Sequence, residues 1–273
     1  MVMVMVMVVP VSVVIPCYKC AATIERAVLS VFAQTVRPAE VILVDDGSPD
    51  ETMGKLQALQ NQHGACVRIV QMPSNAGAAS ARNVGWSQAT QTYIAFLDAD
   101  DAWHTRKLEL QYAYMQSHPA VMLSGHLCRQ LSQHGVNGLH WPVELRGVES
   151  ITWSKFLIRH QFVTPSVMLK REIRFRFAEG MRYMEDHRLW LEIVAHAMPV
   201  VRLEVELAAI FKPAFGASGL SANLWDMEKA ELSNYRYFFE NGKIPFILFH
   251  LLQAYSFAKF LRRWLWVRWG QRV

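Results

Sequence analysis

The chain has 273 residues, of which 52% are hydrophobic and 19% are charged. This length and composition exclude a disordered or fibrous protein and are typical of a globular protein with a large buried core. The formal net charge is +5, but residues 241–273 contribute +6 and the rest of the chain contributes −1. The main body therefore carries no excess of positive charge with which to bind nucleic acid.

The four cysteines, at positions 17, 20, 66 and 128, are too few and too scattered for a disulfide scaffold, so we expect a cytoplasmic protein. Cys17 and Cys20 form a C-x-x-C sequence, which is compatible with a redox pair or with half of a zinc site. No second cysteine or histidine pair at ligand spacing accompanies it.

Residues 1–10 begin with alternating Met and Val, lack the basic start of a secretory signal and are too short to cross a bilayer. We expect them to form an N-terminal extension. Short apolar runs then alternate with helical patterns. The predicted strands are 11–15, 41–44, 67–70 and 93–97, and the predicted helices are 23–34, one that starts with the capping sequence Ser48-Pro49-Asp50-Glu51, and one in the segment 75–85. This order predicts an α/β fold with a mostly parallel, Rossmann-like central sheet and helices on both faces.

The periodicity weakens beyond residue 120, where strands are predicted near 121–123 and 166–169 and a helix near 186–196. No linker rich in Pro, Gly or Ser divides the chain. We therefore expect one domain over residues 11–240, with halves at 11–120 and 121–240, followed by a tail at 241–273.

Acidic clusters follow two of the predicted strands, and ligands of such sheets bind beyond the carboxyl ends of the strands. Asp98-Ala99-Asp100, extended by Asp101, offers hard oxygen ligands that suit Mg²⁺ or Mn²⁺ held together with substrate phosphates. Asp45-Asp46-Gly47-Ser48 offers a carboxylate that can accept from the imide N–H of a pyrimidine. Each cluster alone is equally compatible with a solvated turn that caps a helix.

Together, the motifs resemble a known family. Val13-Val14-Ile15-Pro16-x-Tyr18, Val44-Asp45-Asp46-Gly47-Ser48, Asn75-Ala76-Gly77 with Ala81-Arg82-Asn83-x-Gly85, and Phe96-Leu97-Asp98-Ala99-Asp100-Asp101 are similar to the ordered signatures of family 2 inverting glycosyltransferases of the GT-A fold. Met184-Glu185-Asp186-x-x-Leu189-Trp190 resembles the acidic catalytic motif of that family. The resemblance covers about residues 11–110 closely and extends to about residue 215.

The resemblance implies a role for each matching residue. Pro16 and Tyr18 would line the base site, Asp46 would bind the pyrimidine edge, and Arg82 would lie near the nucleotide and its phosphates. Asp98 and Asp100 would flank the ribose and a divalent cation, Mn²⁺ or Mg²⁺, with Asp100 as the direct ligand. Asp186 would be the general base in preference to Glu185. The chain departs from the family at Lys19, where an asparagine is common.

Plainer interpretations exist for several of these residues. Glu185 and Asp186 are also typical of a helix start, and Trp190 can stack on an acceptor sugar or belong to the core. The segment 212–221 is compatible with a lid in which Lys212 faces the diphosphate, or with a surface loop. His104 and His187 lie near the motifs, but the histidines of the chain are not spaced as metal ligands would be.

The tail is predicted to be a helix with a wide apolar face and a narrow polar stripe formed by His250, Gln253, Ser256, Lys259 and Arg263. Its basic and tryptophan residues favour a position in the headgroup region of an anionic inner leaflet over a membrane span, although a helix packed on the domain or on a partner is the alternative.

The resemblance and the tail together imply a metal-dependent hexosyl- or N-acetylhexosaminyltransferase. It would use a nucleotide sugar, with UDP favoured, and extend a saccharide linked to polyprenyl diphosphate in polysaccharide, O-antigen or capsule synthesis, with residues 121–240 as the acceptor half. Two other classes stay open: a sugar-phosphate nucleotidyltransferase, which would usually have a Gly-rich basic loop after the first strand, and a non-catalytic nucleotide or saccharide binder, which would be expected to lose Asp100 or Asp186.

Overall fold

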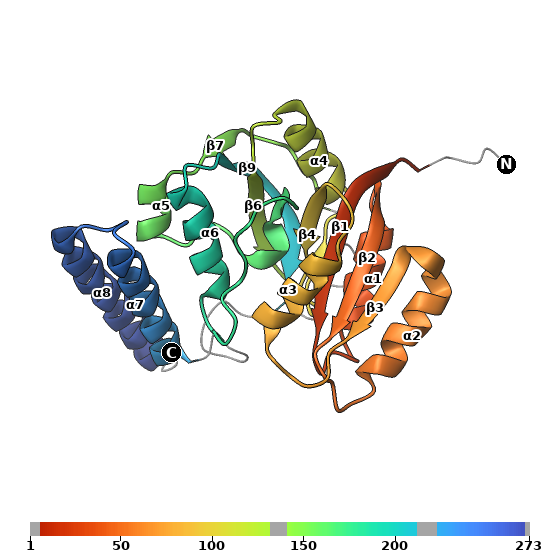
Figure 1. Cartoon of the computed structure of the whole chain (residues 1–273), viewed down its shortest axis with the longest axis horizontal. Helices are drawn as coiled ribbons and strands as arrows, with labels where there is room; N and C mark the ends of the chain where they lie inside the picture. The colour runs from red at the N-terminus through yellow and green to blue at the C-terminus, as the bar shows by residue number, and fades with distance from the viewer. Residues whose placement is uncertain (1–5, 132–140, 212–222, 271–273) are drawn as a thin grey trace.

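The computed structural model describes residues 6–131, 141–211 and 223–270, and its central sheet runs through the molecule with helices packed against it (Figure 1). The strands are β1 (Val8–Cys17), β2 (Arg37–Asp45), β3 (Val67–Gln71), β4 (Tyr93–Phe96), β5 (Ala102–Trp103), β6 (Leu123–Gln130), β7 (Val148–Ser150), β8 (Met168–Lys170) and β9 (Val200–Ile210). The helices are α1 (Ile24–Phe32), α2 (Thr52–His63), α3 (Ala78–Gln88), α4 (Lys107–Ser117), α5 (Trp153–Ile158), α6 (Glu185–Ala195), α7 (Leu224–Glu240) and α8 (Phe246–Gly270), with 3-10 turns η1 (Gly64–Cys66) and η2 (Thr164–Ser166).

The strands of the described residues form one sheet in the order β3-β2-β1-β4-β8-β6-β9-β5, and β7 pairs with β9. Strands β1 to β4 pair in parallel, as do β6 and β9. The pairs β4–β8, β6–β8, β5–β9 and β7–β9 are antiparallel. The predicted α/β fold is confirmed, but only the first half of the sheet is parallel. Beyond β4 the sheet is mixed, since β8 runs antiparallel to both of its neighbours, β4 and β6, and β5 and β7 run antiparallel to β9.

Alternation along β1 sends its side chains into two separate cores. Val11, Val13 and Ile15 pack with α1, α2 and α4 on one face of the sheet. Val14 packs on the other face with α3 and α6. Because successive side chains of a strand point to opposite faces, a strand buried on both faces reads as a continuous apolar run. The predicted placement of helices on both faces of the sheet is confirmed.

The predicted capping sequence before α2 does not cap the helix. Helix α2 begins at Thr52 without a side-chain cap. The Ser48 hydroxyl accepts a hydrogen bond from the backbone N–H of Lys19 at 3.3 Å, and the Asp50 carboxylate accepts from the N–H of Thr52 at 3.3 Å. The capping prediction is wrong because Ser48 is used to join the ends of β1 and β2 instead.

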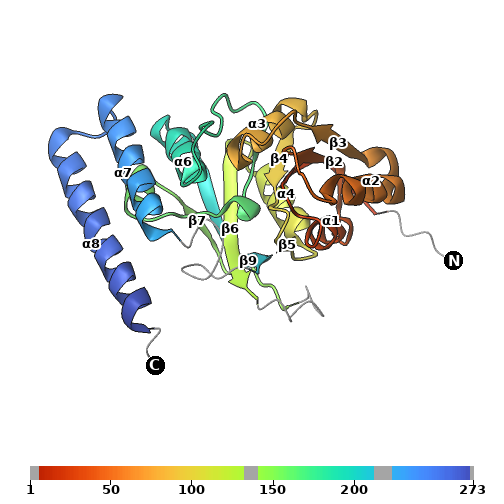
Figure 2. The ribbon, with the colours of Figure 1, turned by 90° about the horizontal axis from the view of Figure 1, so that it is seen from below.

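Helices α7 and α8 lie side by side at the end of the molecule farthest from α2 (Figures 1 and 2). Ser256, Lys259 and Arg263 of the predicted polar stripe of α8 turn toward α7, whereas His250, at the start of the stripe, is exposed. Ser256 is fully buried, the Lys259 ammonium lies 2.5 Å from Glu231 Oε1, and Arg263 lies 3.7 Å from carboxylate oxygens of both Glu228 and Glu231. No helix of the described residues reaches the length and mean hydropathy of a membrane span.

Candidate functional site

A cavity of about 750 Å³ lies at the carboxyl ends of β1, β2 and β4. Parallel strands bring these three ends to the same edge of the sheet, and the loop before α3 and the start of α6 complete the wall. The side chains that line it and carry chemistry are Tyr18, Lys19, Asp46, Arg82, Asp98, Asp100, Arg182 and Glu185, together with Pro16, Cys17 and Cys20. The structure therefore brings together most of the residues that the motifs singled out.

Asp46 holds one wall of the cavity in place. Its Oδ1 accepts from the backbone N–H of Ala76 at 2.7 Å, and its Oδ2 accepts from the N–H of Gly77 at 2.9 Å. Gly47 follows with φ +64°, and a Cβ atom there would come within 2.9 Å of backbone atoms of Ser74 and Asn75. Only glycine accommodates both the left-handed conformation and this close approach, so Asp46 and Gly47 together fix the loop that leads into α3.

Tyr18 and Lys19 form the opposite rim. The Tyr18 side chain lines the cavity and remains exposed, so its ring is accessible for stacking on a flat ligand. The Lys19 ammonium lies 5.4 Å from the centre of that ring, and the residue has a left-handed backbone with φ +49°. This turn directs a positive charge to the rim, at the position where the sequence departs from the family pattern.

Arg82 is buried and joins the two acidic motifs. Its guanidinium donates to Asp98 Oδ1 at 2.7 Å and to Glu185 Oε1 at 2.9 Å. Burial lowers the pKa of Arg82, but the charges of Asp98 and Glu185 outweigh it and the net pKa is raised. Burial also raises the pKa of Glu185, as does the charge of Asp186, and the Arg82 charge offsets part of that rise. Arg82 therefore stays charged and ties α6 to the end of β4.

Asp98 and Asp100 fit a divalent cation that takes its other ligands from a substrate. Both line the cavity, and carboxylate oxygens are the ligands that Mg²⁺ and Mn²⁺ prefer. Within the described ranges, no group of three or more His, Cys, Asp or Glu side chains is placed to hold a metal ion. Such a cation would therefore depend on oxygens of a bound substrate, and at Asp98 it would compete with Arg82.

Asp186 lies beside the cavity rather than in its wall. Its Oδ1 accepts from the backbone N–H of His187 at 2.7 Å, and its Oδ2 accepts from the Thr164 hydroxyl at 3.3 Å. Glu185 and Asp186 do form the first turn of α6, so the plainer interpretation as a helix start also holds. Unlike Glu185, Asp186 has no arginine among the ion partners that the described residues supply.

Three predictions need correction or lie outside the described residues. Trp190 has an exposed fraction of 0% and packs edge-on to Phe177 with ring centres 5.7 Å apart, so it belongs to the core and has no ring face for a sugar. Cys17 and Cys20 are free and buried, and the described residues offer no further ligands to complete a zinc site. Lys212 and the predicted lid at 212–221 lie outside the described residues.

The sequence reasoning missed several residues at the site. Arg182 lines the cavity, and the Arg26 guanidinium donates to the backbone carbonyl of Asp100 and covers the Phe211 ring at 3.6 Å. Thr164 and His160 reach Asp186 from the segment before β8. Arg182 lies two positions before the Met184-Glu185-Asp186 motif but is not part of it, and the other residues reach the site from segments outside the motifs.

Comparison with known proteins gives a consistent result. The family described as "Glycosyl transferase family 2" matches residues 12–173. The amylovoran biosynthesis glycosyltransferase AmsE of Erwinia amylovora is 28% identical over 215 residues, which cover 78% of this chain and 79% of AmsE. WfgD of Escherichia coli, named as a UDP-Glc:alpha-D-GlcNAc-diphosphoundecaprenol beta-1,3-glucosyltransferase, is 29% identical over 184 residues, which cover 67% of this chain and 69% of WfgD.

Two solved structures share the fold. The Staphylococcus aureus TarS 1–349 fragment in complex with UDP-GlcNAc superposes with a TM-score of 0.65 at 18% identity, over 83% of this chain and 66% of that chain. The chain thus spans just under two thirds of that fragment. The mannosyltransferase PcManGT of Pyrobaculum calidifontis, in complex with GDP-Man and Mn²⁺, superposes with a TM-score of 0.66 at 19% identity, over 91% of this chain and 73% of that chain. At these identities the two structures support the GT-A fold alone.

Proposed function

The chain belongs to glycosyl transferase family 2, and on that premise we propose that it is an inverting glycosyltransferase that moves a sugar from a UDP-sugar to a hydroxyl of a lipid-linked saccharide. The observation that carries the proposal is Arg82, which joins the Asp98 side of the cavity to the first turn of α6. This link sets a donor-binding wall and a pair of acidic side chains next to each other in one buried site.

Different residues of the cavity are suited to bind the base and the diphosphate of the donor. We assign the base to the Tyr18 and Pro16 rim, with the Tyr18 ring stacking on it. Asp46 is already hydrogen-bonded to the loop at Ala76 and Gly77, but each carboxylate oxygen has a second lone pair to offer an imide N–H. Lys19 and Arg182 line the same cavity and supply positive charge for the diphosphate.

Asp100, with Asp98, would hold Mn²⁺ or Mg²⁺, which when bound offsets the negative charge that develops on the departing diphosphate. Asp186 takes the proton from the acceptor hydroxyl as the new C–O bond forms and the bond to the diphosphate breaks. We assign this role to Asp186 because Arg82 already pairs with Glu185. Glu185 acts instead as the partner that orients Arg82. One displacement without a covalent intermediate inverts the anomeric configuration.

The name of WfgD and the structure of α8 support an acceptor at the inner face of the cytoplasmic membrane. WfgD is named for a diphosphoundecaprenol-linked acceptor. Helix α8 turns its polar stripe inward to α7 and leaves apolar side chains exposed on its outer face, including Ile247 at 75% and Trp266 at 70%. Lys243 and Arg262 lie exposed near the two ends of this outer face. We propose that this face lies in the headgroup region and brings the site to a lipid-linked saccharide.

The experiment that tests the main proposal separates donor binding from transfer. Calorimetry with UDP-glucose, UDP-GlcNAc, dTDP-glucose and GDP-mannose, with and without Mn²⁺, identifies a donor. Transfer is then measured onto a GlcNAc-diphospho-lipid, and the anomeric coupling constant of the product reports inversion. We expect Asp186→Asn to lower transfer by about 100-fold or more while donor affinity changes less than about threefold.

Two further variants complete this experiment. We expect Asp100→Asn to remove the effect of Mn²⁺ on donor binding. Asp226→Asn, at a half-buried carboxylate on α7 that does not line the cavity, is the control and should behave like the wild type. If no nucleotide sugar binds in any condition, or if the enzyme joins a nucleoside triphosphate to a sugar phosphate, the proposal is refuted.

A further inference from the structure

His160 lies against the side chain to which we assign the general base. Its Nε2 atom is 3.5 Å from Asp186 Oδ2. The same oxygen accepts from the Thr164 hydroxyl, and Oδ1 accepts from the backbone N–H of His187. Three segments thus converge on one carboxylate: the residues between α5 and η2, η2 itself, and the first turn of α6.

The Nε2 atom of His160 makes no hydrogen bond within the described residues. At 3.5 Å it stands where a proton on Asp186 Oδ2 would form one. The Nε2 atom itself is buried while the His160 side chain as a whole is 29% exposed, so an imidazolium formed by protonation at Nε2 can release a proton to water from its other ring nitrogen. His187 packs beside it with ring centres 4.8 Å apart but is fully buried, and neither of its ring nitrogens has a partner among the described residues.

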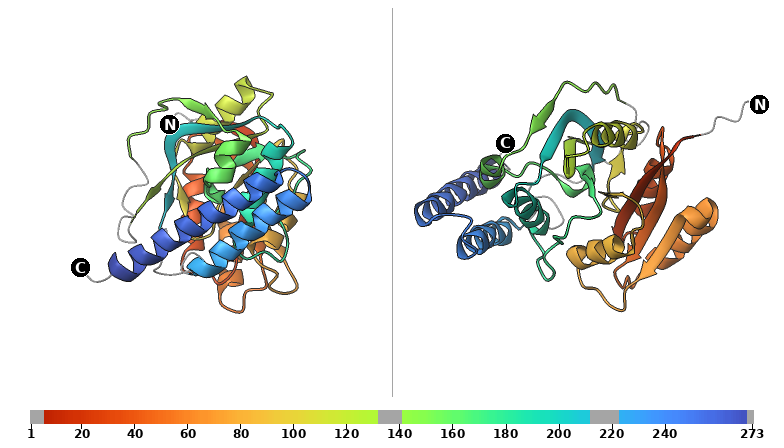
Figure 3. Two further views of the ribbon diagram at one scale, coloured as in Figure 1. Left: turned by 90° about the vertical axis from the view of Figure 1, so that its left-hand side faces the viewer. Right: turned by 45° about the horizontal axis from the view of Figure 1, so that its top comes forward.

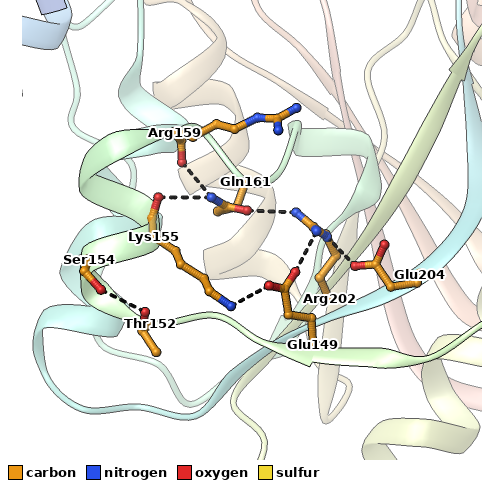
Figure 4. A network of polar contacts seen from close by, with 8 residues as sticks. All are labelled: Glu149, Thr152, Ser154, Lys155, Arg159, Gln161, Arg202 and Glu204. Atoms are coloured by element: carbon orange, nitrogen blue, oxygen red, sulfur yellow. Dashed lines mark hydrogen bonds and ion pairs between the residues drawn. The ribbon is translucent and has the colours of Figure 1, made fainter. Parts of the chain in front are cut away.

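A network of polar contacts fixes the segment that carries His160 (Figure 4). The Gln161 amide donates to the carbonyls of Lys155 and Arg159 at 3.0 and 3.1 Å, which closes the end of α5. Its Oε1 accepts from Arg202 at 2.8 Å. Arg202 on β9 also pairs with Glu149 and Glu204, and Lys155 pairs with Glu149. Gln161, which follows His160, is therefore tied to β9 through Arg202, and Arg202 in turn pairs with Glu149 on β7, so the backbone beside His160 is held in position.

We propose that His160 is a positioning residue that receives from Asp186 the proton released by the acceptor hydroxyl. The inference rests on the proposed function, because it takes Asp186 as the base. The proton moves from the hydroxyl to Asp186 Oδ2 as the glycosidic bond forms, then from Oδ2 to His160 Nε2, and finally to water. An imidazole is intrinsically a stronger base than a carboxylate, and this second transfer frees the Asp186 carboxylate for the next turnover.

The charged and titratable groups around His160 favour proton transfer from Asp186 to His160. Asp186 on α6 is the negative group that faces it, and it stabilises an imidazolium. Burial lowers the pKa of His187 well below its ordinary value, and the charges of His160 and of Lys259 on α8 lower it further. His187 therefore stays neutral and does not compete for the proton.

The kinetic test compares His160→Gln and His160→Gly with His196→Gln, an exposed histidine at the end of α6. We expect both His160 variants to lower kcat by about 10- to 100-fold with the KM for the donor within a factor of two, and the control to match the wild type. Added imidazole should restore part of the kcat of His160→Gly. Unchanged kcat in the two His160 variants, or a loss that imidazole fails to relieve while KM rises, would overturn the inference.

A measurement without turnover tests the same pairing. In protein labelled with ¹⁵N-histidine, the His160 Nε2 resonance at fixed pH should move in Asp186→Asn and stay in place in Glu192→Gln, an unrelated carboxylate on α6. A resonance that does not respond to Asp186→Asn rejects the inference. If the wild type neither binds nucleotide sugars nor transfers a sugar, the proposed function fails, and the resonance still decides whether His160 and Asp186 interact.

Discussion

Lys107 is the clearest case of a side chain whose burial opposes its ordinary chemistry. The residue has no exposed surface, and its Nζ atom lies 3.7 Å from the centre of the Trp103 ring without a hydrogen-bond acceptor among the described residues. Burial lowers the pKa of Lys107 well below its usual range. Within the described ranges an ammonium in this position meets the face of the Trp103 ring, which does not replace the water that it loses.

We therefore predict that Lys107→Met stabilises the fold, by about 1 kcal/mol and roughly 2–4 °C in Tm. Because the folded-state pKa is depressed, the cost of the lysine is full below that pKa and shrinks as the pH rises through it toward the unfolded-state value. Thermal unfolding of the variant at pH 7 and pH 10 measures both effects. Lys55→Met, at an exposed position of α2, is the control. A lower Tm for Lys107→Met at pH 7 would mean that the Trp103 contact outweighs desolvation.

Asp46 and Arg82 line the cavity but are also bonded to the protein itself. Their sequence motifs correctly marked them as residues of the cavity. The motifs did not reveal that both side chains already form hydrogen bonds with protein groups. Asp46 accepts from the backbone at Ala76 and Gly77, and Arg82 donates to Asp98 and Glu185. Both side chains therefore shape the cavity through contacts with protein groups, in addition to any contact with a ligand.

Among the elements, the loop before α3 depends most sharply on one residue. We predict that Gly47→Ala weakens donor binding by at least tenfold and costs about 1–3 kcal/mol of stability, because φ is +64° and the new Cβ would meet backbone atoms of Ser74 and Asn75. Calorimetric titration and thermal unfolding measure the two effects. Gly54→Ala, in α2 with open space around the added carbon, should be neutral or slightly stabilising. Wild-type donor affinity in Gly47→Ala would argue against a role for this loop in binding.

The α7–α8 pair contains a carboxylate that should make stability depend on pH. Glu228 is fully buried, and burial raises its pKa above the ordinary value. The ionised form is therefore penalised in the folded state. This penalty is present above the folded-state pKa and disappears as the pH falls through it toward the unfolded-state value.

We accordingly predict that the Tm of Glu228→Gln relative to the wild type increases as the pH rises from about 5 to 8. Thermal unfolding across that range gives the comparison. Glu240→Gln, at an exposed position of the same helix, should track the wild type. A difference in Tm that is the same at every pH would show that Glu228 does not titrate differently in the folded state.

At the scale of the whole molecule, we assign donor binding to the cavity and lipid contact to the outer face of α8. Figure 3 shows α7 and α8 as an antiparallel pair that covers one end of the molecule. A chain cut near residue 242 would remove Lys259 and Arg263 from the buried carboxylates of Glu228 and Glu231, so deletion of the tail would confuse membrane binding with misfolding. Substitutions on the outer face alone avoid this problem.

We predict that Ile247→Gln combined with Leu251→Gln reduces flotation with vesicles that contain phosphatidylglycerol by about tenfold, since both side chains are exposed and apolar. Ile158→Gln, an exposed apolar residue of α5, should leave flotation unchanged. Arg262→Gln should weaken binding mainly at low salt. Wild-type flotation in the double variant, or a wild-type dimer that the double variant dissociates without any vesicle binding, would contradict the assignment of this face to lipid.

The sequence alone determined the strands and helices of the first hundred residues, their parallel order and the acidic clusters at the strand ends. It could do so because apolar periodicity, turn residues and motif spacing are local properties of the chain. It also located the helix that carries Glu185 and Asp186 and the apolar character of α8.

Only the tertiary structure decided which partners these residues meet. Arg82 joins carboxylates that lie 16 and 103 positions away in the chain, and His160 reaches Asp186 from a separate segment. Trp190 is in the core, and the polar stripe of α8 faces Glu228 and Glu231 rather than water. Periodicity reveals that a helix has two faces, but what each face contacts depends on where the rest of the chain packs.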